Sequence, residues 1–305
     1  MPANITITSL KMKRFFIFSI LIVIFGISAH AQLLWKITGT NLKKPSYLFV
    51  THNLIPIQFL DSIPEVFRAY SHCDIVVSEV ALNNIEDMTK IQQAALLPDN
   101  TTLADLLNID EFTTVDNELR LVLEKGLNTF ARLHPALVRT FYQTELFKKT
   151  TAFAEDTQSD SYFQLTATQQ GKQVVGLETA EQQISFLFPQ NNTLKHEADL
   201  LVNAVVNKEK ELASMLSEIK HYKTGNIDLL SNTLKQKEQE RYPSIEEYEQ
   251  QLKQRNIQQF AQLLELINAS PCFITVSAIH LQGQFGLINL LREKKYNVKE
   301  VIPIK

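Results

Sequence analysis

Cysteine is scarce in this sequence, which contains only Cys73 and Cys272 among its 305 residues. Two cysteines are too few for a structural zinc signature of the finger or ribbon type. Each of them stands at the start of an apolar, strand-like run, so the two thiols could be neighbours at one edge of a sheet. The sequence leaves both a disulfide and a pair of buried free thiols open.

An excess of positive charge is also missing. The chain has 30 Lys and Arg residues against 33 Asp and Glu, which gives a formal net charge of −3. Because no basic stripe is available to neutralise phosphates, the composition excludes nucleic acid as a partner. The chain also lacks an internal repeat of the period typical of solenoids. With 45% hydrophobic and 21% charged residues, it has the composition of an ordinary globular protein.

No apolar run is long enough to span a bilayer. The longest, Phe15 to Ser28, has about 14 residues, whereas a spanning helix needs roughly 20. Three basic residues between positions 11 and 14 precede this run, and Ala29-His30-Ala31 follows it with the small residues that a signal peptidase recognises. We therefore expect residues 1–31 to be a cleaved signal peptide and the protein to be periplasmic or secreted. An uncleaved anchor is the alternative.

Short apolar runs at both ends of the remaining chain predict strands. Residues 33–38 and 46–51 flank the turn sequence GTNLKKP and are expected to pair as a hairpin. DIVVSEV (74–80) and CFITVSAIH (272–280) are continuous apolar runs, which is typical of strands buried on both faces of a sheet. A helical pattern and a last strand follow the second run, and this order predicts a parallel crossover.

The middle of the chain reads as helical. Apolar residues recur at spacings of three and four between about residues 85 and 270, except for a strand near 173–178. The charged block KQKEQER (235–241) is typical of a solvated helix face. The expected fold is therefore α/β: a mixed or parallel central sheet flanked by helices, with a large helical insertion in the middle.

Polar residues follow four of the predicted strands. They are Thr51 to Asn53, Glu79, Glu178 and His280. Because ligands of open α/β sheets bind beyond the carboxyl ends of the strands, these groups are candidate site residues. Carboxylate and imidazole could bind a metal or act as acid and base. The alternatives are that Glu178 complements a helix dipole, that Glu79 pairs with an arginine, and that His280 is a buried structural histidine.

Several segments together resemble the TraB/GumN family, which includes the Tiki-type metal-dependent proteases. They are LLWKITGTNLKKPSYLFVTHNLIP, CDIVVSEV, GKQVVGLETAEQQ, the pair Arg255-Asn256, and FITVSAIHLQGQFGLINLLREKKYNV. The resemblance covers residues 32–305 in the family's order and implies one domain of Tiki-like fold. It further implies a metal site built from two Gly-x-x-His motifs and a glutamate, with an arginine near it.

The chain departs from that family pattern at the first motif. Val50 takes the glycine position and Asn53 the histidine position, while His52 lies one residue earlier. The resemblance assigns Glu79, His280 and Arg255 to catalysis, and Glu79, His280, Asn53 and His52 to metal binding. On a continuous strand His52 points away from Asn53, and a one-residue bulge would be needed to turn it toward the site.

Two functional hypotheses follow from this resemblance. In the first, the protein is a degenerate, non-catalytic member that keeps a cleft for a peptide or small-molecule ligand at the carboxyl edge of the sheet. In the second, it is an active metal-dependent peptidase or hydrolase that uses Glu79 and His280 with His52 or Asn53. The first implies no cofactor or a weakly bound divalent metal, because asparagine is a poor partner for imidazole at a zinc site.

Overall fold

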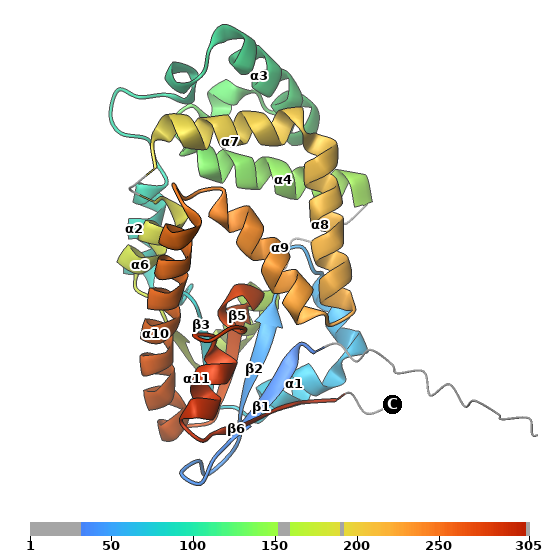
Figure 1. Ribbon diagram of the computed structural model, residues 1–305, viewed down its shortest axis with the longest axis vertical. Helices are drawn as coiled ribbons and strands as arrows, with labels where there is room; N and C mark the ends of the chain where they lie inside the picture. Colours follow the sequence, from blue (N-terminus) through green and yellow to red (C-terminus); the bar gives the residue numbers. More distant parts are fainter. Residues whose placement is uncertain (1–31, 152–158, 190–191, 303–305) are drawn as a thin grey trace, which may run out of the picture.

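The computed structural model describes residues 32–151, 159–189 and 192–302 (Figure 1). The predicted signal segment, residues 1–31, lies outside these ranges. Within them, no helix combines the length and the apolar character that a membrane span requires.

Six strands form one mixed sheet in the described part of the chain, as the sequence predicts. In chain order they are β1 (Leu34–Thr38), β2 (Ser46–Thr51), β3 (Ile75–Ser78), β4 (Gln173–Gly176), β5 (Cys272–Ser277) and β6 (Asn297–Glu300). Their order across the sheet is β4-β3-β5-β2-β1-β6. β2, β5, β3 and β4 are parallel, whereas β1 is antiparallel to both β2 and β6. The predicted hairpin of β1 and β2 is thus confirmed.

The central strands are apolar along their whole length because both of their faces are covered. All four residues of β3 are buried, and so are the first five of β5. β5 lies between β2 and β3, in a register that pairs Phe49 with Thr275 and Val77 with Ile274. The last strands confirm the predicted parallel crossover, although β6 pairs with β1 and not with β5 itself.

The directions of the connections decide which helices cover which face. The chain moves toward one edge of the sheet from β2 to β3 and from β3 to β4, and toward the other edge from β4 to β5 and from β5 to β6. Right-handed crossovers that run in opposite directions place their helices on opposite faces. Accordingly α1 (Pro64–Ser71) and α5 (Ser159–Gln169) lie on one face, and α10 (Ile245–Ala269) and α11 (Leu287–Glu293) on the other (Figure 1).

Aromatic packing joins the first of these helix layers to the sheet. Phe163 of α5 lies with its ring centroid 4.7 Å from that of Phe273 and 5.9 Å from that of Phe49. Tyr70 of α1 meets Phe273 edge-on at 5.7 Å. Offset and edge-on geometries of this kind are the favoured ones for aromatic pairs, so this face is held by specific packing as well as by burial.

The helical middle region contains α2 (Ile85–Ala94), α3 (Ile109–Leu123), α4 (Pro135–Thr151), α6 (Ala180–Leu187), α7 (Leu194–Val206), α8 (Lys208–Lys223) and α9 (Ile227–Gln239). Short 3-10 helices occur at Ile57–Ser62, Leu103–Leu106, Leu127–Phe130 and Ala278–His280. We call α3, α4 and α7 the helical cap, because they share a hydrophobic core of their own. Figure 1 shows the cap beyond the carboxyl ends of the strands, with α8 and α9 running between the cap and the sheet.

The two cysteines are buried free thiols. Cys272 begins β5 and Cys73 lies two residues before β3, at the end of the strands opposite the cap. Burial raises the pKa of each thiol to about 12. Because the thiolate is the reactive form of cysteine, neither side chain is a nucleophile at neutral pH.

Candidate functional site

A cavity of about 500 Å³ lies between the carboxyl ends of the central strands and the helices of the middle region. The sheet contributes residues that follow or end β2, β3 and β5, and α4, α8 and α9 supply much of the opposite wall. β3 and β5 are neighbours in the sheet. After β3 the chain continues to β4 at one edge of the sheet, and after β5 it continues to β6 at the other edge. This is the topology at which a crevice opens in α/β sheets, so the fold itself places the cavity here.

Glu79 directly follows β3 and lines this cavity. Its Oε1 accepts a hydrogen bond of 2.8 Å from the backbone N–H of Ser277, the last residue of β5. His280 Nε2 is 3.5 Å from the same oxygen, and Arg255 Nη2 is 3.6 Å from Oε2. Burial alone would raise the pKa of Glu79, but His280, Arg255 and the Ser277 N–H together lower it to about 2. The carboxylate is therefore ionised at neutral pH.

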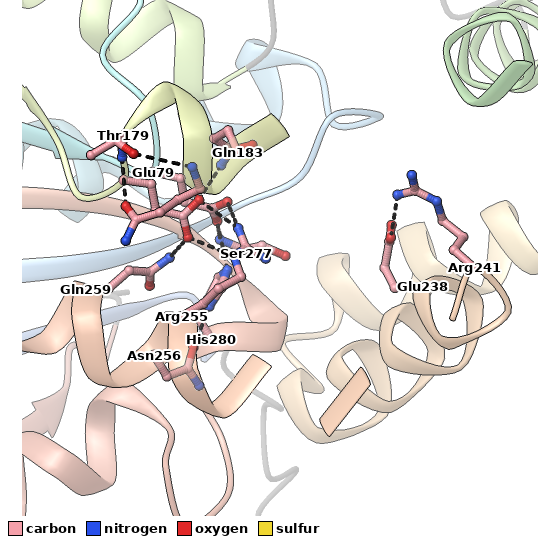
Figure 2. Close-up of polar contacts among 12 residues, drawn as sticks. Glu79, Thr179, Gln183, Glu238, Arg241, Arg255, Asn256, Gln259, Ser277 and His280 are labelled. Carbon is pink, nitrogen blue, oxygen red and sulfur yellow. Dashed lines mark hydrogen bonds and ion pairs between the residues drawn. The ribbon is translucent and has the colours of Figure 1, made fainter. Parts of the chain in front are cut away.

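Arg255 of α10 binds Glu178 more closely than it binds Glu79. Its Nε and Nη2 donate to the two oxygens of Glu178 at 2.8 and 3.0 Å, which is the bidentate geometry of strong arginine–carboxylate pairs. Gln259 and Gln183 also donate to Glu178, at 2.6 and 2.7 Å. Figure 2 shows these side chains converging beside Glu79. Glu178 thus serves as the counterion of a buried arginine as well as preceding the N-cap of α6.

Gly176 allows Glu178 to reach this position. A Cβ on Gly176 would lie 2.9 Å from the backbone nitrogen of Ala81, too close for any other residue without a backbone shift. The close approach lets the chain after β4 continue beside the chain after β3, where the Glu178 N–H donates to the Glu79 carbonyl at 2.9 Å. The two glutamates are therefore brought together by backbone pairing.

His280 lies fully buried at the end of the 3-10 turn that follows β5. Its Nδ1 is 2.5 Å from Asn256 Oδ1, and because an amide oxygen only accepts, Nδ1 carries the proton. Its Nε2 faces Glu79 and has no hydrogen-bond partner among the described residues. We refer to Glu79, Glu178, Arg255, Asn256, Gln259 and His280 as the edge cluster.

His52 is directed toward α8 instead of toward Glu79. Its Nδ1 accepts from the N–H of Leu54 at 3.1 Å, and its Nε2 is 3.3 Å from Oε2 of the buried Glu218. The pairing of β2 with β5 continues without interruption to Thr51, so the bulge that would re-aim His52 does not form. Asn53 is exposed and lines the cavity beside His52. The structure thus brings Glu79, His280 and Arg255 into contact and leaves His52 and Asn53 out of that contact.

A divalent metal, which the family resemblance implies, does not fit this donor set. Glu79 Oε1 and His280 Nε2, 3.5 Å apart, could share an ion at ordinary ligand distances of about 2.0–2.2 Å. However, catalytic zinc sites use three protein ligands, and the described residues contain no group of three His, Cys, Asp or Glu side chains arranged for a metal. The Arg255 guanidinium beside Glu79 also places a positive charge against the same carboxylate.

A second group of charges lines the cavity on the side of the cap. Its lining members are Arg139 of α4, Glu238 of α9 and Arg241, and the buried Glu197 of α7 lies within 4 Å of both arginines without lining the cavity. We call these four residues the cap cluster. Arg241 Nη1 donates to Glu238 at 3.2 Å, and its Nη2 donates to the Leu187 carbonyl. Figure 2 shows the Glu238–Arg241 pair set apart from the edge cluster. The prediction of a solvated face for residues 235–241 is wrong at Arg241, which is 6% exposed. Lys237 and Glu238 are partly exposed and line the cavity.

For some of the site residues the sequence pattern indicates burial, and for others it does not. Arg255, Asn256 and Gln259 stand at spacings of three and four between Leu252 and Leu263, on the buried stripe of α10. Polar residues within such a stripe indicate a buried network. No sequence pattern identifies Arg139 and Glu218 as site residues, because charged residues on a helix are ordinarily expected to face solvent.

Comparison with known proteins gives one match. Residues 33–300 match the TraB/PrgY/gumN family, which is nearly the whole of the described chain. No curated protein and no solved structure matched the sequence.

Proposed function

Because this chain belongs to the TraB/PrgY/gumN family, we propose that it is an exported, non-catalytic member that binds a peptide or small ligand in the cavity above the sheet. The observation that carries this proposal is the use of both histidines within the protein. His280 is bonded to Asn256 and faces Glu79, while His52 is engaged by Leu54 and Glu218. His280 does not line the cavity, and the His52 ring is directed toward Glu218 and not toward Glu79.

The state of Glu79 supports the same proposal. A general base works best when its pKa lies near the working pH, and the pKa of Glu79 is about 2. The carboxylate is further occupied by the Ser277 N–H and by two cationic or potentially cationic side chains. Such a group holds neighbouring residues in place and is a weak proton acceptor.

The cavity supports a binding role. Its volume of about 500 Å³ lies within the range of roughly 300–1,000 Å³ that is usual for small-molecule sites. Its lining combines apolar groups such as Leu137 and Phe188 with charged ones such as Arg139 and Lys237. Mixed linings of this kind orient a ligand through a few polar contacts.

Export is part of the proposal and rests on the basic, apolar and Ala-His-Ala segments at the start of the chain. N-terminal sequencing of protein recovered from the periplasm or medium is expected to begin at Gln32. Recovery of the protein in the cytoplasm with its first residues retained would contradict export.

The experiment that tests the non-catalytic proposal has two parts. Zinc, manganese and cobalt are each titrated calorimetrically into the purified protein at neutral pH, and a pool of fluorogenic peptides is incubated with the protein and each metal. We expect no stoichiometric metal binding and no cleavage above a Glu79→Ala control. Cleavage that the control abolishes would overturn the proposal.

One observation favours the alternative of a metal-dependent peptidase or hydrolase. His280 Nε2 is a buried nitrogen without a hydrogen-bond partner among the described residues, and it faces Glu79. This alternative needs His52 or Asn53 as a further ligand. Stoichiometric metal binding by the unmodified protein that is lost in His52→Ala or Asn53→Ala would establish it in place of the first proposal.

A further inference from the structure

Arg139 is a half-buried arginine whose side chain forms no hydrogen bond with the described residues. Its side chain is 13% exposed and lines the cavity, and its closest charged partner, Glu197, is 3.8 Å from Nη2. This distance is too long for a hydrogen bond. Within the described chain, the guanidinium therefore has five N–H donors and no hydrogen-bonded acceptor.

The other groups of the cap cluster form no hydrogen bond with Arg139 in this structure. Glu197 is 1% exposed and is shared between the two arginines, with Arg241 Nε 3.5 Å from its Oε1. Glu197 Oε2 and Arg241 Nε both lack hydrogen bonds to described residues. Glu238 is already bonded to Arg241 at 3.2 Å. Burial lowers the pKa of Arg139 while Glu197 raises it, which reflects a desolvated and incompletely paired cation.

The balance of charge around the cavity limits what can bind there. Arg139 and Arg241 face Glu197 and Glu238, and Lys237 lies 3.6 Å from Glu218. Each positive group thus has a negative neighbour, so a polyanion would meet as many carboxylates as cations. A ligand with a single negative group can use the open donors of Arg139 without that repulsion.

We propose that the cavity binds the carboxylate of a short peptide through Arg139, an inference that rests on the binding role proposed above. The planar guanidinium matches a carboxylate in a two-point hydrogen bond. Thr144 is one and a half turns further along α4, lines the same cavity, and can offer its hydroxyl to the peptide. The rest of the peptide extends over the apolar lining of Leu137 and Phe188 toward the sheet.

The test uses two matched pools of N-acetylated tripeptides, one ending in a free carboxylate and the other in an amide, with inorganic phosphate as a third probe. Binding to the purified protein is followed by ligand-observed NMR titration. We compare the unmodified protein with Arg139→Gln, Arg139→Lys and the control Arg68→Gln. Arg68 is a suitable control because it is 63% exposed on α1 and does not line the cavity.

We expect the free-carboxylate pool to bind at least about tenfold more tightly than the amide pool, since a charge-assisted hydrogen bond is lost with the amide. Arg139→Gln is expected to remove this difference, Arg139→Lys to retain part of it, and Arg68→Gln to leave it unchanged. Circular dichroism identifies any variant that does not fold. If Arg139→Gln is unfolded, the inference is tested by Arg139→Lys, in which the difference in affinity between the two pools is expected to be smaller than in the unmodified protein.

Three outcomes would overturn the inference and separate it from the proposed function. Equal binding of both pools would remove the role of Arg139 and leave peptide binding intact. Binding of phosphate in preference to the carboxylate pool, lost in Arg139→Gln, would assign the site to phosphate instead. Binding of neither pool to the unmodified protein would contradict peptide binding as well as the carboxylate site.

Discussion

The edge cluster and the cap cluster are both groups of charges beside the same cavity, and they differ in how closely the buried carboxylate of each, Glu178 or Glu197, is bonded. Around Glu178, the donors of Arg255, Gln183 and Gln259 lie 2.6–3.0 Å away. Around Glu197, the two arginines lie 3.5 and 3.8 Å away. The carboxylate of Glu178 is thus fully bonded within the protein, whereas that of Glu197 is not. Arg255 Nη1, Gln259 Oε1 and His280 Nε2 of the edge cluster still lack a hydrogen-bond partner among the described residues. Position at a strand end does not by itself identify the part of a site that remains open to a ligand.

The largest expected effect comes from removing Arg255 from the edge cluster. Arg255→Met removes the cation from between Glu178 and Glu79 and leaves a carboxylate with 2% side-chain exposure without its counterion. We expect the free energy of unfolding in urea to fall by about 3–5 kcal/mol, as for other broken buried ion pairs. The exposed control Arg68→Met is expected to change it by less than about 0.5 kcal/mol. Similar losses in both variants would show that the edge cluster contributes no special stability.

The next effect is a dependence of stability on pH that belongs to Glu79. Folding lowers the pKa of this carboxyl from an ordinary value of 4.5 to about 2. Its ionised form therefore stabilises the fold fully above about pH 4.5, and this contribution is lost as the pH falls toward 2. We expect Glu79→Gln to be less stable than the unmodified protein at pH 6 and the gap to narrow at pH 3, as measured by urea unfolding. A gap that widens at low pH would contradict the ionised state.

A smaller effect is expected on the affinity for metal, and it tests the edge cluster alone. Asn53→His restores an imidazole at the family position, near an edge cluster that already holds Glu79 and His280. We expect zinc to bind this variant at least about tenfold more tightly than the unmodified protein in calorimetric titration, because a ligand is added to the set. The gain should disappear in combination with Glu79→Ala or His280→Ala. A gain that survives both combinations would place the bound metal elsewhere.

The smallest expected effect concerns the stability that Arg139 of the cap cluster contributes. Arg139→Gln removes a cation that has no hydrogen-bonded acceptor among the described residues, and it leaves Glu197 with Arg241. We expect the free energy of unfolding to fall by no more than about 1 kcal/mol, well below the effect of Arg255→Met. A loss as large as that of Arg255→Met would show that the two clusters are energetically alike.

The sheet and the location of the site were predictable because short-range patterns determine them. Continuous apolar runs predicted the central strands β3 and β5, and polar residues after those runs marked the edge where Glu79 and His280 meet. The resemblance to the family placed Arg255 nearby, and the family is confirmed. The roles assigned to these residues stay predictions.

The cap side of the cavity was not predictable, because its burial arises from tertiary packing. Arg241 lies in a charged block whose pattern is that of a solvated helix, and only the approach of α7 and the end of α6 buries it. The direction of His52 depended in the same way on a distant partner, Glu218 of α8. Periodicity describes one element at a time and carries no information about which charged faces will meet.

The central position of β5 has a consequence for the order of events when the chain folds. This strand lies between β2 and β3, and the contact of Cys272 with Ser46 joins residues 226 positions apart. Contacts of such long range close slowly, because the entropy of the intervening loop is lost before they form. During synthesis, β2 and β3 lack their shared neighbour until residues 272–277 are available. The sheet therefore completes only after residues 272–300 have been made, and until then the nascent chain lacks the strand that joins β2 to β3.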